Sequence, residues 1–358
     1  MALHVRGVVL PDDEVRDLYL VGDRVSFEPV AGAETVVAEG FVVPGLVDAH
    51  CHIGIGQGGA PVTSVEQARA AALIDRDTGV LALRDAGSPY PYPSLDDDPS
   101  MPRLARAGRH LAPPKKHLRG IPLEVTANEV VAAAAEQAKA GNGWIKLVAD
   151  WLDRGAEDLA PCYDEATTRA VIDTAHAHGA RVAAHTFSEE AVGFLVRAGV
   201  DSVEHGTGLS LDLIDEMARR GTALVPTMIN IETFQGIASQ AESKFPGYAE
   251  HMRDLHRRFP SVVRAAYEAG VPIRVGTDGG GTIAHGLVAE EMLALRAAGL
   301  SAVDALAAGS WAARDWLGFP GLVEGGLADL VVYPEDPRRD LAVVRAPSRI
   351  VLRGRVVR

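Results

Sequence analysis

Two histidines separated by one residue are the sharpest chemical signal in the sequence. His50 and His52 flank Cys51 and follow the apolar segment 44–49. In an extended strand, residues i and i+2 point to the same side, so both imidazoles would enter one cavity and Cys51 would point away. Imidazole is a common ligand for zinc and its neighbours. The alternative is two unrelated histidines near a loop, but the lead-in segment favours two metal ligands.

Four further candidate ligands accompany other short apolar segments. His185, His205 and Asp278 each follow such a segment, and Lys146 lies inside 144–149. Burial in a strand lowers the pKa of a lysine, and a neutral amine can react with carbon dioxide to give a carbamate, an anionic ligand able to bridge two metal ions. Taken singly, each histidine is more often a hydrogen-bonded residue and the lysine more often reaches solvent. Taken together with the first pair, the set favours a binuclear metal site.

The segments that carry these residues alternate with helical patterns. Eight parallel strands with helical crossovers predict an α/β fold, a (β/α)8 TIM barrel whose active site lies at the carboxyl ends of the strands. Each predicted strand ends in or carries a polar group that would face this site. The strands are predicted over 42–48, 80–84, 104–109, 144–149, 181–184, 202–204, 223–226 and 272–276, and helices over 129–140, 164–178, 188–198 and 261–269.

Both ends of the chain contain short β-like pieces separated by turn residues. Neither end is long enough to form a stable sheet alone. We therefore expect residues 1–41 and 322–358 to form one small, β-sandwich-like domain, with the barrel over residues 42–321.

Composition limits the class of protein. The 358 residues are 47% hydrophobic and 23% charged, which is typical of a soluble globular protein. The net charge of −13 argues against a nucleic-acid partner, and two cysteines exclude a disulfide framework. No apolar run approaches the roughly 18 residues of a membrane span, and the N-terminus lacks a secretory pattern. We expect a cytoplasmic protein with a small-molecule substrate and no membrane partner.

Several motifs make the chain similar to a known family. The segments 44–52, 84–87, 277–278, 285–286 and 326–332 resemble the amidohydrolase superfamily. Within it, the similarity is to the group of Xaa-Pro and related dipeptidases, imidazolonepropionase-like proteins and ochratoxin-type amidases. The resemblance covers nearly the whole chain. Its ligand set is specific to the superfamily and much less so to any one substrate.

The resemblance implies a set of metal ligands and a reaction. Two divalent ions, with zinc expected, would share a hydroxide that attacks the carbonyl of an amide C–N bond in a dipeptide, an N-acyl amino acid or a cyclic amide. The implied ligands are His50 and His52 for the more buried ion, His185 and His205 for the second, carboxylated Lys146 as the bridge, and Asp278 as a ligand and as general base and acid.

Two departures from the family pattern weaken a prolidase assignment. Phe187 stands where the dipeptidases usually carry a tyrosine whose hydroxyl can polarise the scissile carbonyl. The loop around His117 has lost the glycines usual after the third strand and gained lysines. Neither change affects the ligand set. The candidate substrate contacts are His110, His117, Phe187 and His285.

Three alternatives stay open. A mononuclear deaminase would need a glutamate three residues after His185, where the chain has Ser188. A mononuclear, imidazolonepropionase-like ring-opening enzyme would leave Lys146 uncarboxylated. A catalytically inactive scaffold of the same fold would typically have lost metal ligands. The exact substrate, the number of ions and the existence of a homo-oligomer are not decided by the sequence.

Overall fold

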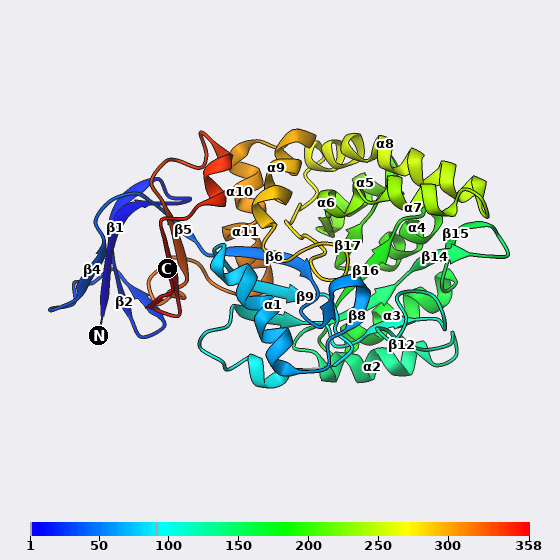
Figure 1. Ribbon diagram of the computed structural model, residues 1–358, viewed down its shortest axis with the longest axis horizontal. Helices are drawn as coiled ribbons and strands as arrows, with labels where there is room; N and C mark the ends of the chain where they lie inside the picture. The colour runs from blue at the N-terminus through cyan, green and yellow to red at the C-terminus, as the bar shows by residue number, and fades with distance from the viewer. Residues whose placement is uncertain (1, 91) are drawn as a thin grey trace.

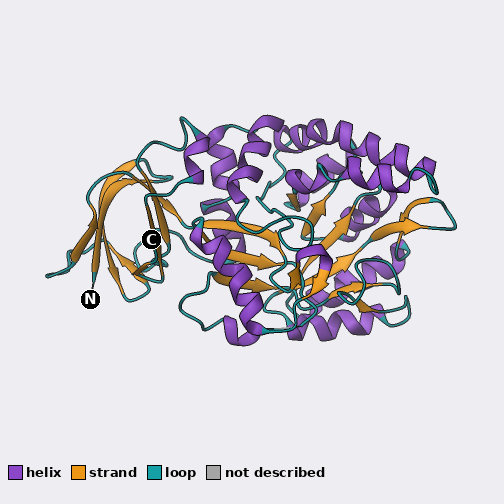
Figure 2. Ribbon diagram, viewed as in Figure 1, coloured by secondary structure: helices purple, strands orange, loops and turns teal. Residues whose placement is uncertain are grey.

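The computed structural model describes residues 2–90 and 92–358, so Met1 of the predicted terminal domain lies outside the described residues. Figure 1 shows a sheet that contains both chain ends, beside a larger body that is built from strands and helices. Figure 2 shows that helices cover the strands of this larger body from above and below. Within the described residues, no helix is both long and apolar enough to cross a membrane.

Strands from both ends of the chain pair in one sheet, in the order β21–β20–β19–β5–β1–β2–β3, with β4 paired to β1. β5 links the two ends, because it pairs in parallel with β1 and antiparallel with β19. A separate apolar cluster that includes Leu18, Leu20 and Leu330 lies against this sheet. The bounds of its strands are Leu3–Val9 (β1), Glu14–Val21 (β2), Arg24–Ser26 (β3), Glu34–Val37 (β4), Phe41–Pro44 (β5), Leu330–Tyr333 (β19), Arg349–Leu352 (β20) and Arg355–Val356 (β21).

The prediction of one strand over 42–48 is wrong. β5 belongs to the terminal sheet, whereas β6 (Leu46–Cys51) belongs to a parallel sheet, and the single residue Gly45 separates them. A Cβ at Gly45 would lie 2.6 Å from Cβ of Leu81, so only glycine allows this close approach. The terminal sheet therefore extends to Pro44, past the expected boundary at residue 41.

Two parallel sheets form the larger body, with strand orders β10–β9–β6 and β12–β11–β13–β16–β17–β18. The prediction of an α/β fold with parallel strands is confirmed. Two short antiparallel pairs, β7–β8 and β14–β15, are added at the strand ends. The bounds are Ile55–Gly56 (β7), Ala60–Pro61 (β8), Val80–Asp85 (β9), Arg103–Arg106 (β10), His110–Ala112 (β11), Leu123–Glu124 (β12), Trp144–Val148 (β13), Asp150–Asp153 (β14), Asp158–Pro161 (β15), Arg181–Thr186 (β16), Ser202–His205 (β17) and Ala223–Val225 (β18).

The third and eighth predicted strands differ from expectation. Residues 103–106 pair with β9, whereas residues 110 and 111 pair with β13. The chain therefore crosses between the two sheets over 107–109, where Gly108 has a φ of +68° that an extended strand does not allow. Residues 272–276 form no regular strand. Isolated parallel bridges instead join Ile273 to β18 and Gly279 to β6. Closure into an eight-stranded barrel stays a prediction.

Helices cover the parallel strands. The predictions over 129–140, 164–178 and 188–198 agree with α2, α3 and α4 within two residues. The bounds are Val65–Asp77 (α1), Val130–Ala140 (α2), Glu165–Ala177 (α3), Glu189–Ala198 (α4), Leu211–Arg220 (α5), Met228–Ile231 (α6), Phe234–Ala241 (α7), Pro246–Glu268 (α8), Val288–Ala298 (α9), Ala302–Ala308 (α10) and Trp311–Leu317 (α11), with 3-10 helices at Gln57–Gly59, Pro93–Leu95 and Leu341–Arg345.

The predicted helix over 261–269 is only the end of α8, which runs through Pro260. A proline inside a helix normally ends or kinks it, so the pattern before residue 261 is easily taken for a separate element. Here Leu255 and Phe259 before the proline and Val263 after it are all fully buried at helical spacing. This continuous apolar face keeps the helix packed across the break.

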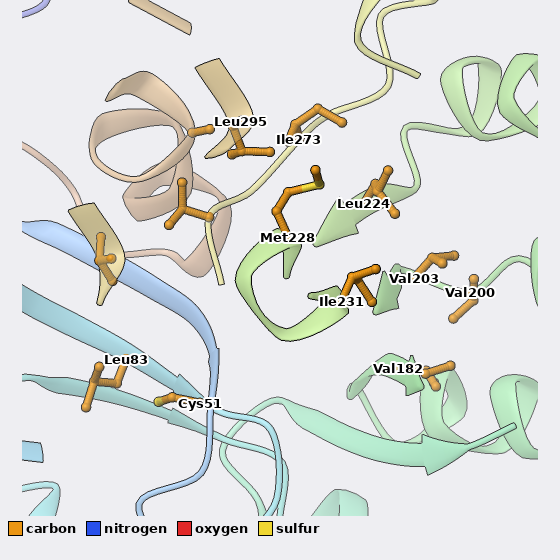
Figure 3. Packing of buried hydrophobic residues seen from close by; sticks show 14 of the residues in the cluster. Cys51, Leu83, Val182, Val200, Val203, Leu224, Met228, Ile231, Ile273 and Leu295 are labelled. Atoms are coloured by element: carbon orange, nitrogen blue, oxygen red, sulfur yellow. The ribbon is translucent and has the colours of Figure 1, made fainter. Parts of the chain in front are cut away.

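A large apolar cluster lies between the strands and the helices. Figure 3 shows Leu83 and Cys51 together at one side of it, and Val182, Val203 and Leu224 at the other. Cys51 is fully buried there, with its Sγ 3.8 Å from the carbonyl oxygen of Arg84. It therefore points into the hydrophobic core.

His251 on α8 joins three elements. Its Nδ1 lies 2.9 Å from a carboxylate oxygen of Asp158 in β15, and its Nε2 lies 3.2 Å from Glu189 at the start of α4. Hydrogen bonds to Glu189 and Asp158 raise the pKa of His251 to about 9. The protonated imidazole thus fastens the β14–β15 hairpin and α4 to α8.

This raised pKa predicts a pH-dependent stability. Because the pKa of His251 is higher in the folded state, its interactions stabilise the fold fully below its ordinary pKa of 6.5. This contribution is lost as the pH rises through about 9. Since the cluster is partly exposed, we expect the free energy of unfolding of wild type to exceed that of His251→Gln by about 1 kcal/mol at pH 6. The difference should fall toward zero at pH 10 in chemical denaturation. His178→Gln, at an exposed helix end, is the control, and an equal change with pH in both variants would contradict the prediction.

Candidate metal centre

A cavity of about 850 Å³ opens where the parallel strands end. Nine of the ten predicted site residues line it, although they come from segments far apart in the sequence. They are His50, His52, His110, His117, Lys146, His185, Phe187, His205 and Asp278.

The two histidines of the first motif meet one carboxylate. Oδ1 of Asp278 lies 3.3 Å from Nε2 of His50 and 3.1 Å from Nε2 of His52. One ligand atom from each of the three residues lies within 4.8 Å of the others. On the far side of the rings, Nδ1 of His52 donates to the carbonyl of Gly87 (2.9 Å), and Nδ1 of His50 lies 2.7 Å from Glu204. These contacts leave both Nε2 atoms for an ion, as in metal sites whose ligand histidines are oriented from behind.

Backbone and side-chain hydrogen bonds hold Asp278 in place. The N–H and hydroxyl of Thr277 donate to the two carboxylate oxygens of Asp48 (3.0 and 2.5 Å), and the N–H of Asp278 donates to the carbonyl of His50 (2.7 Å). Asp278 has a φ of +58°, a strained conformation for a residue other than glycine. Nδ2 of Asn230 donates to its Oδ2 (2.8 Å). Oδ1 is thereby turned toward the two histidines.

Interactions with His50 and His52 keep the pKa of Asp278 well below its ordinary value, although burial acts in the opposite direction. The carboxylate is therefore ionised at neutral pH. It can serve as a metal ligand and accept a proton.

Lys146 comes from the middle of β13 and is 2% exposed. Its Nζ lies 3.2 Å from Nε2 of His50. Burial lowers the pKa of Lys146 to about 8. A neutral amine is thus accessible near neutral pH, directly beside the histidine pair.

His185 and His205 lie at the carboxyl ends of neighbouring parallel strands, with ring centroids 4.7 Å apart. Nδ1 of His205 lies 2.7 Å from the hydroxyl of Thr227, and Nε2 of His185 lies 4.0 Å from Asp150. Burial lowers the pKa of both histidines well below the ordinary value. Both imidazoles are therefore neutral, as metal ligands must be.

A buried ion pair lies behind His50. Nη2 of Arg84 donates to both carboxylate oxygens of Glu204 (2.7 and 2.6 Å), and both side chains are completely buried. The guanidinium of Arg84 lies 4.6 Å from the ring centroid of Trp144. Burial raises the pKa of Glu204, but Arg84 and His50 outweigh this and keep it well below its ordinary value. His50 is thus oriented by a charged carboxylate.

Sequence reasoning missed the residues that hold the ligands from behind. Besides Glu204, these include Asp150, whose Oδ2 accepts from the hydroxyl of Thr186 (2.7 Å) and from the N–H groups of Phe187 and Ser188 (2.8 Å each). This carboxylate fixes the turn that follows β16. The sequence does show Glu204 as a charged residue in an otherwise apolar strand, but it does not show that Arg84 is its partner.

Two further histidines stand beside the ligand set. The ring centroid of His110 lies 5.0 Å from that of His52 and 4.9 Å from that of His117. Both ring nitrogens of His110 and Nδ1 of His117 are buried without a hydrogen-bond partner in the described part of the chain. Unpaired buried polar atoms are costly, so they favour a bound group in the cavity.

His285 is set apart from the other predicted residues. Across residues 2–90 and 92–358 it is not among those that line the cavity. Its Nδ1 lies 2.8 Å from Asp75 on α1, and the same carboxylate accepts the N–H of Gly286 (2.6 Å). His285 thus fastens its loop to α1, and its role as a substrate contact stays a prediction.

Comparison with known proteins identifies the class. The sequence model of the Amidohydrolase family matches residues 41–357, so the chain belongs to this family. This agrees with the superfamily resemblance of the motifs. Membership supports a metal-binding hydrolase of carbon–nitrogen bonds and leaves the substrate open.

The relatives extend over the whole chain. Uncharacterized proteins of Mycobacterium tuberculosis and Mycobacterium bovis are 52% identical over 354 residues, which is 99% of this chain and 95% of theirs. Three solved structures share the fold: a putative prolidase from Bifidobacterium longum (27% identity, TM-score 0.82, 100% of this chain and 94% of that one), a Xaa-Pro dipeptidase with bound methionine (24%, 0.82, 99% and 98%) and the A. niger ochratoxinase (20%, 0.83, 99% and 95%).

Proposed function

We propose that this protein is a metal-dependent amidohydrolase that cleaves an amide C–N bond with the help of two divalent ions, zinc being expected. The observation that carries the proposal is the meeting of two Nε2 atoms, from His50 and His52, with one oxygen of Asp278. His185, His205 and Lys146 line the same cavity. The family match and the dipeptidase and prolidase among the similar structures support an amide substrate.

The donor set fits such ions. His50, His52 and Asp278 would hold one ion, and the neutral imidazoles of His185 and His205 would hold the second. Lys146 would bridge them as a carbamate, formed when its neutral amine adds to the carbon of carbon dioxide and loses one proton. Its lowered pKa and its place beside His50 support this step.

When bound, the ions would supply an activated water and positive charge beside the substrate carbonyl. Asp278 accepts the proton of the attacking water and delivers it to the leaving nitrogen. Asn230 holds the other carboxylate oxygen, so that Oδ1 keeps its direction. His110 and His117 offer unpaired nitrogens to the polar groups of the substrate.

A mononuclear ring-opening hydrolase or deaminase is the second candidate. It is favoured by one observation, that the tight cluster of ligand atoms within 4.8 Å comprises His50, His52 and Asp278. Such an enzyme would bind one ion and would not need Lys146.

Counting ions in Lys146→Ala separates these candidates. After reconstitution with zinc, elemental analysis should give two ions per wild-type chain and about one or none in the variant. Because the bridge is lost, kcat/KM for an amide should fall by at least about 100-fold. Lys139→Ala, at an exposed position of α2, is the control. One ion in both proteins with unchanged activity would favour the mononuclear candidate, and no hydrolysis of any amide by metal-loaded wild type would contradict the proposal as a whole.

A further inference from the structure

Aromatic side chains line the outer part of the cavity. We propose that the enzyme acts on uncharged amides that carry a large, flat, apolar group next to the scissile carbonyl, in preference to free dipeptides. This inference rests on the proposed amide hydrolysis and names the class of substrate. It is carried by an aromatic wall, defined as Trp151, Phe187, Phe234, Phe245 and Tyr248, all of which line the cavity.

The wall begins at the proposed ligands of the second ion. The ring centroid of Phe187 lies 4.4 Å from that of His185 and 5.0 Å from that of His205. Phe234 on α7 meets Phe187 edge to face at 4.8 Å. An apolar surface thus continues from the metal centre toward α7.

Trp151 forms the second side of this surface. It lies on β14, and its ring centroid is 5.1 Å from that of His117 and 5.6 Å from that of His185. Trp151 and Phe187 therefore reach the same histidine from two different elements. A planar group attached to a carbonyl at the metal centre would lie against both rings, and such aromatic contacts are favourable beyond the area that they bury.

Further apolar side chains line the cavity next to the aromatic wall. The β14–β15 hairpin and α7 contribute Leu152, Leu159, Ile237 and Ala241, beside the polar side chains of Thr233 and Gln240. A volume of about 850 Å³ suits a ligand well above the size of a small amide.

The charged side chains in the outer part of the cavity lie at its exposed edge. In the described part of the chain, no arginine lines the cavity, and outside the metal centre the lining side chains that carry charge are Glu232 and Lys244. Both are exposed, and Glu232 lies 3.2 Å from His256. Exposed ion pairs contribute little, whereas a buried ammonium or carboxylate without a partner is costly. The wall therefore disfavours the two charges of a dipeptide.

Three substrates test the inference with zinc-loaded protein: N-methyl-2-(2-naphthyl)acetamide, N-methylacetamide and glycyl-proline. The first two share the same reacting bond and differ only in the naphthyl group. Burial of that ring predicts a kcat/KM about 100-fold higher for the naphthyl amide than for N-methylacetamide. The naphthyl amide should also be cleaved faster than glycyl-proline.

Trp151→Ala should reduce the ratio of the two amides to about 10 or less, because one side of the wall is lost. Leu211→Ala, at a position that is 71% exposed and outside the cavity, is the matched control and should keep the ratio. Calorimetry with 2-acetylnaphthalene, a ketone that cannot be hydrolysed, tests the wall without catalysis. Wild type should bind it, and Trp151→Ala should bind it at least about 10-fold more weakly.

The possible results separate the two proposals. If the protein cleaves none of the three substrates but hydrolyses another amide, the inferred preference is overturned and the proposed function stands. If it hydrolyses no amide at all, the proposed function fails, and ketone binding still decides whether the wall takes an aromatic group. If amides are cleaved with a ratio near one, or glycyl-proline is the best substrate, the inference is overturned while amide hydrolysis stands. Equal ketone binding by wild type and Trp151→Ala would also overturn it.

Discussion

Asp278→Asn is expected to lower kcat/KM for the best amide substrate by at least about 1,000-fold. Asparagine has nearly the same shape as aspartate, and its amide oxygen can still accept the hydrogen bond from Asn230. It cannot take a proton from the attacking water, and it gives a weaker, uncharged ligand between His50 and His52. The loss should therefore lie mainly in kcat, and the folded structure should persist.

The measurement compares kinetics, zinc content and thermal unfolding of the variant with those of wild type. Asp215→Asn, an exposed carboxylate on α5, is the control and should retain the wild-type rate. If Asp278→Asn kept more than about a tenth of the activity, Asp278 would not be the base, and the proton path would have to run elsewhere.

Arg84→Met is expected to destabilise the protein by about 3–5 kcal/mol. Arg84 is completely buried, and its loss would leave the carboxylate of Glu204 buried without its cation. Glu204 in turn lies 2.7 Å from Nδ1 of His50, so the orientation of this ligand should suffer as well.

A double-mutant cycle measured by chemical denaturation checks this effect. Glu204→Gln removes the negative charge, so the double variant Arg84→Met, Glu204→Gln should recover part of the stability that Arg84→Met loses. The exposed pair Arg197 and Glu165 is the control, and its disruption by Arg197→Met should cost less than about 1 kcal/mol. Additive costs for the two buried substitutions would show that the pair is not coupled.

The sequence predicted the histidine pair because its signal is local. A spacing of two residues in a strand is enough to put His50 and His52 on one side, and both line the cavity. The parallel α/β fold followed from alternation of apolar strands with helical segments. The helices expected to end at Gly141 and Gly179, α2 and α3, were placed within two residues.

What the sequence could not predict depends on contacts between distant segments. Arg84 and Glu204 are 120 positions apart, and the residues around each of them give no indication that the two side chains pair. The break at Gly45 lies inside an apolar run, at a position where the close approach of Leu81 leaves no room for a side chain. Pro260 illustrates the opposite case, because a strong local stop signal is overruled by the buried face of α8.

The single residue between β5 and β6 ties the two bodies of the molecule together. β5 is flanked by β1 from one end of the chain and by β19 from the other, and β6 leads directly to His50. The terminal sheet consequently anchors the near end of the strand whose far end carries the first proposed metal ligands. Trimming either terminus would remove one of the two strands that flank β5, so we expect truncation of the small sheet to disturb the metal centre as well.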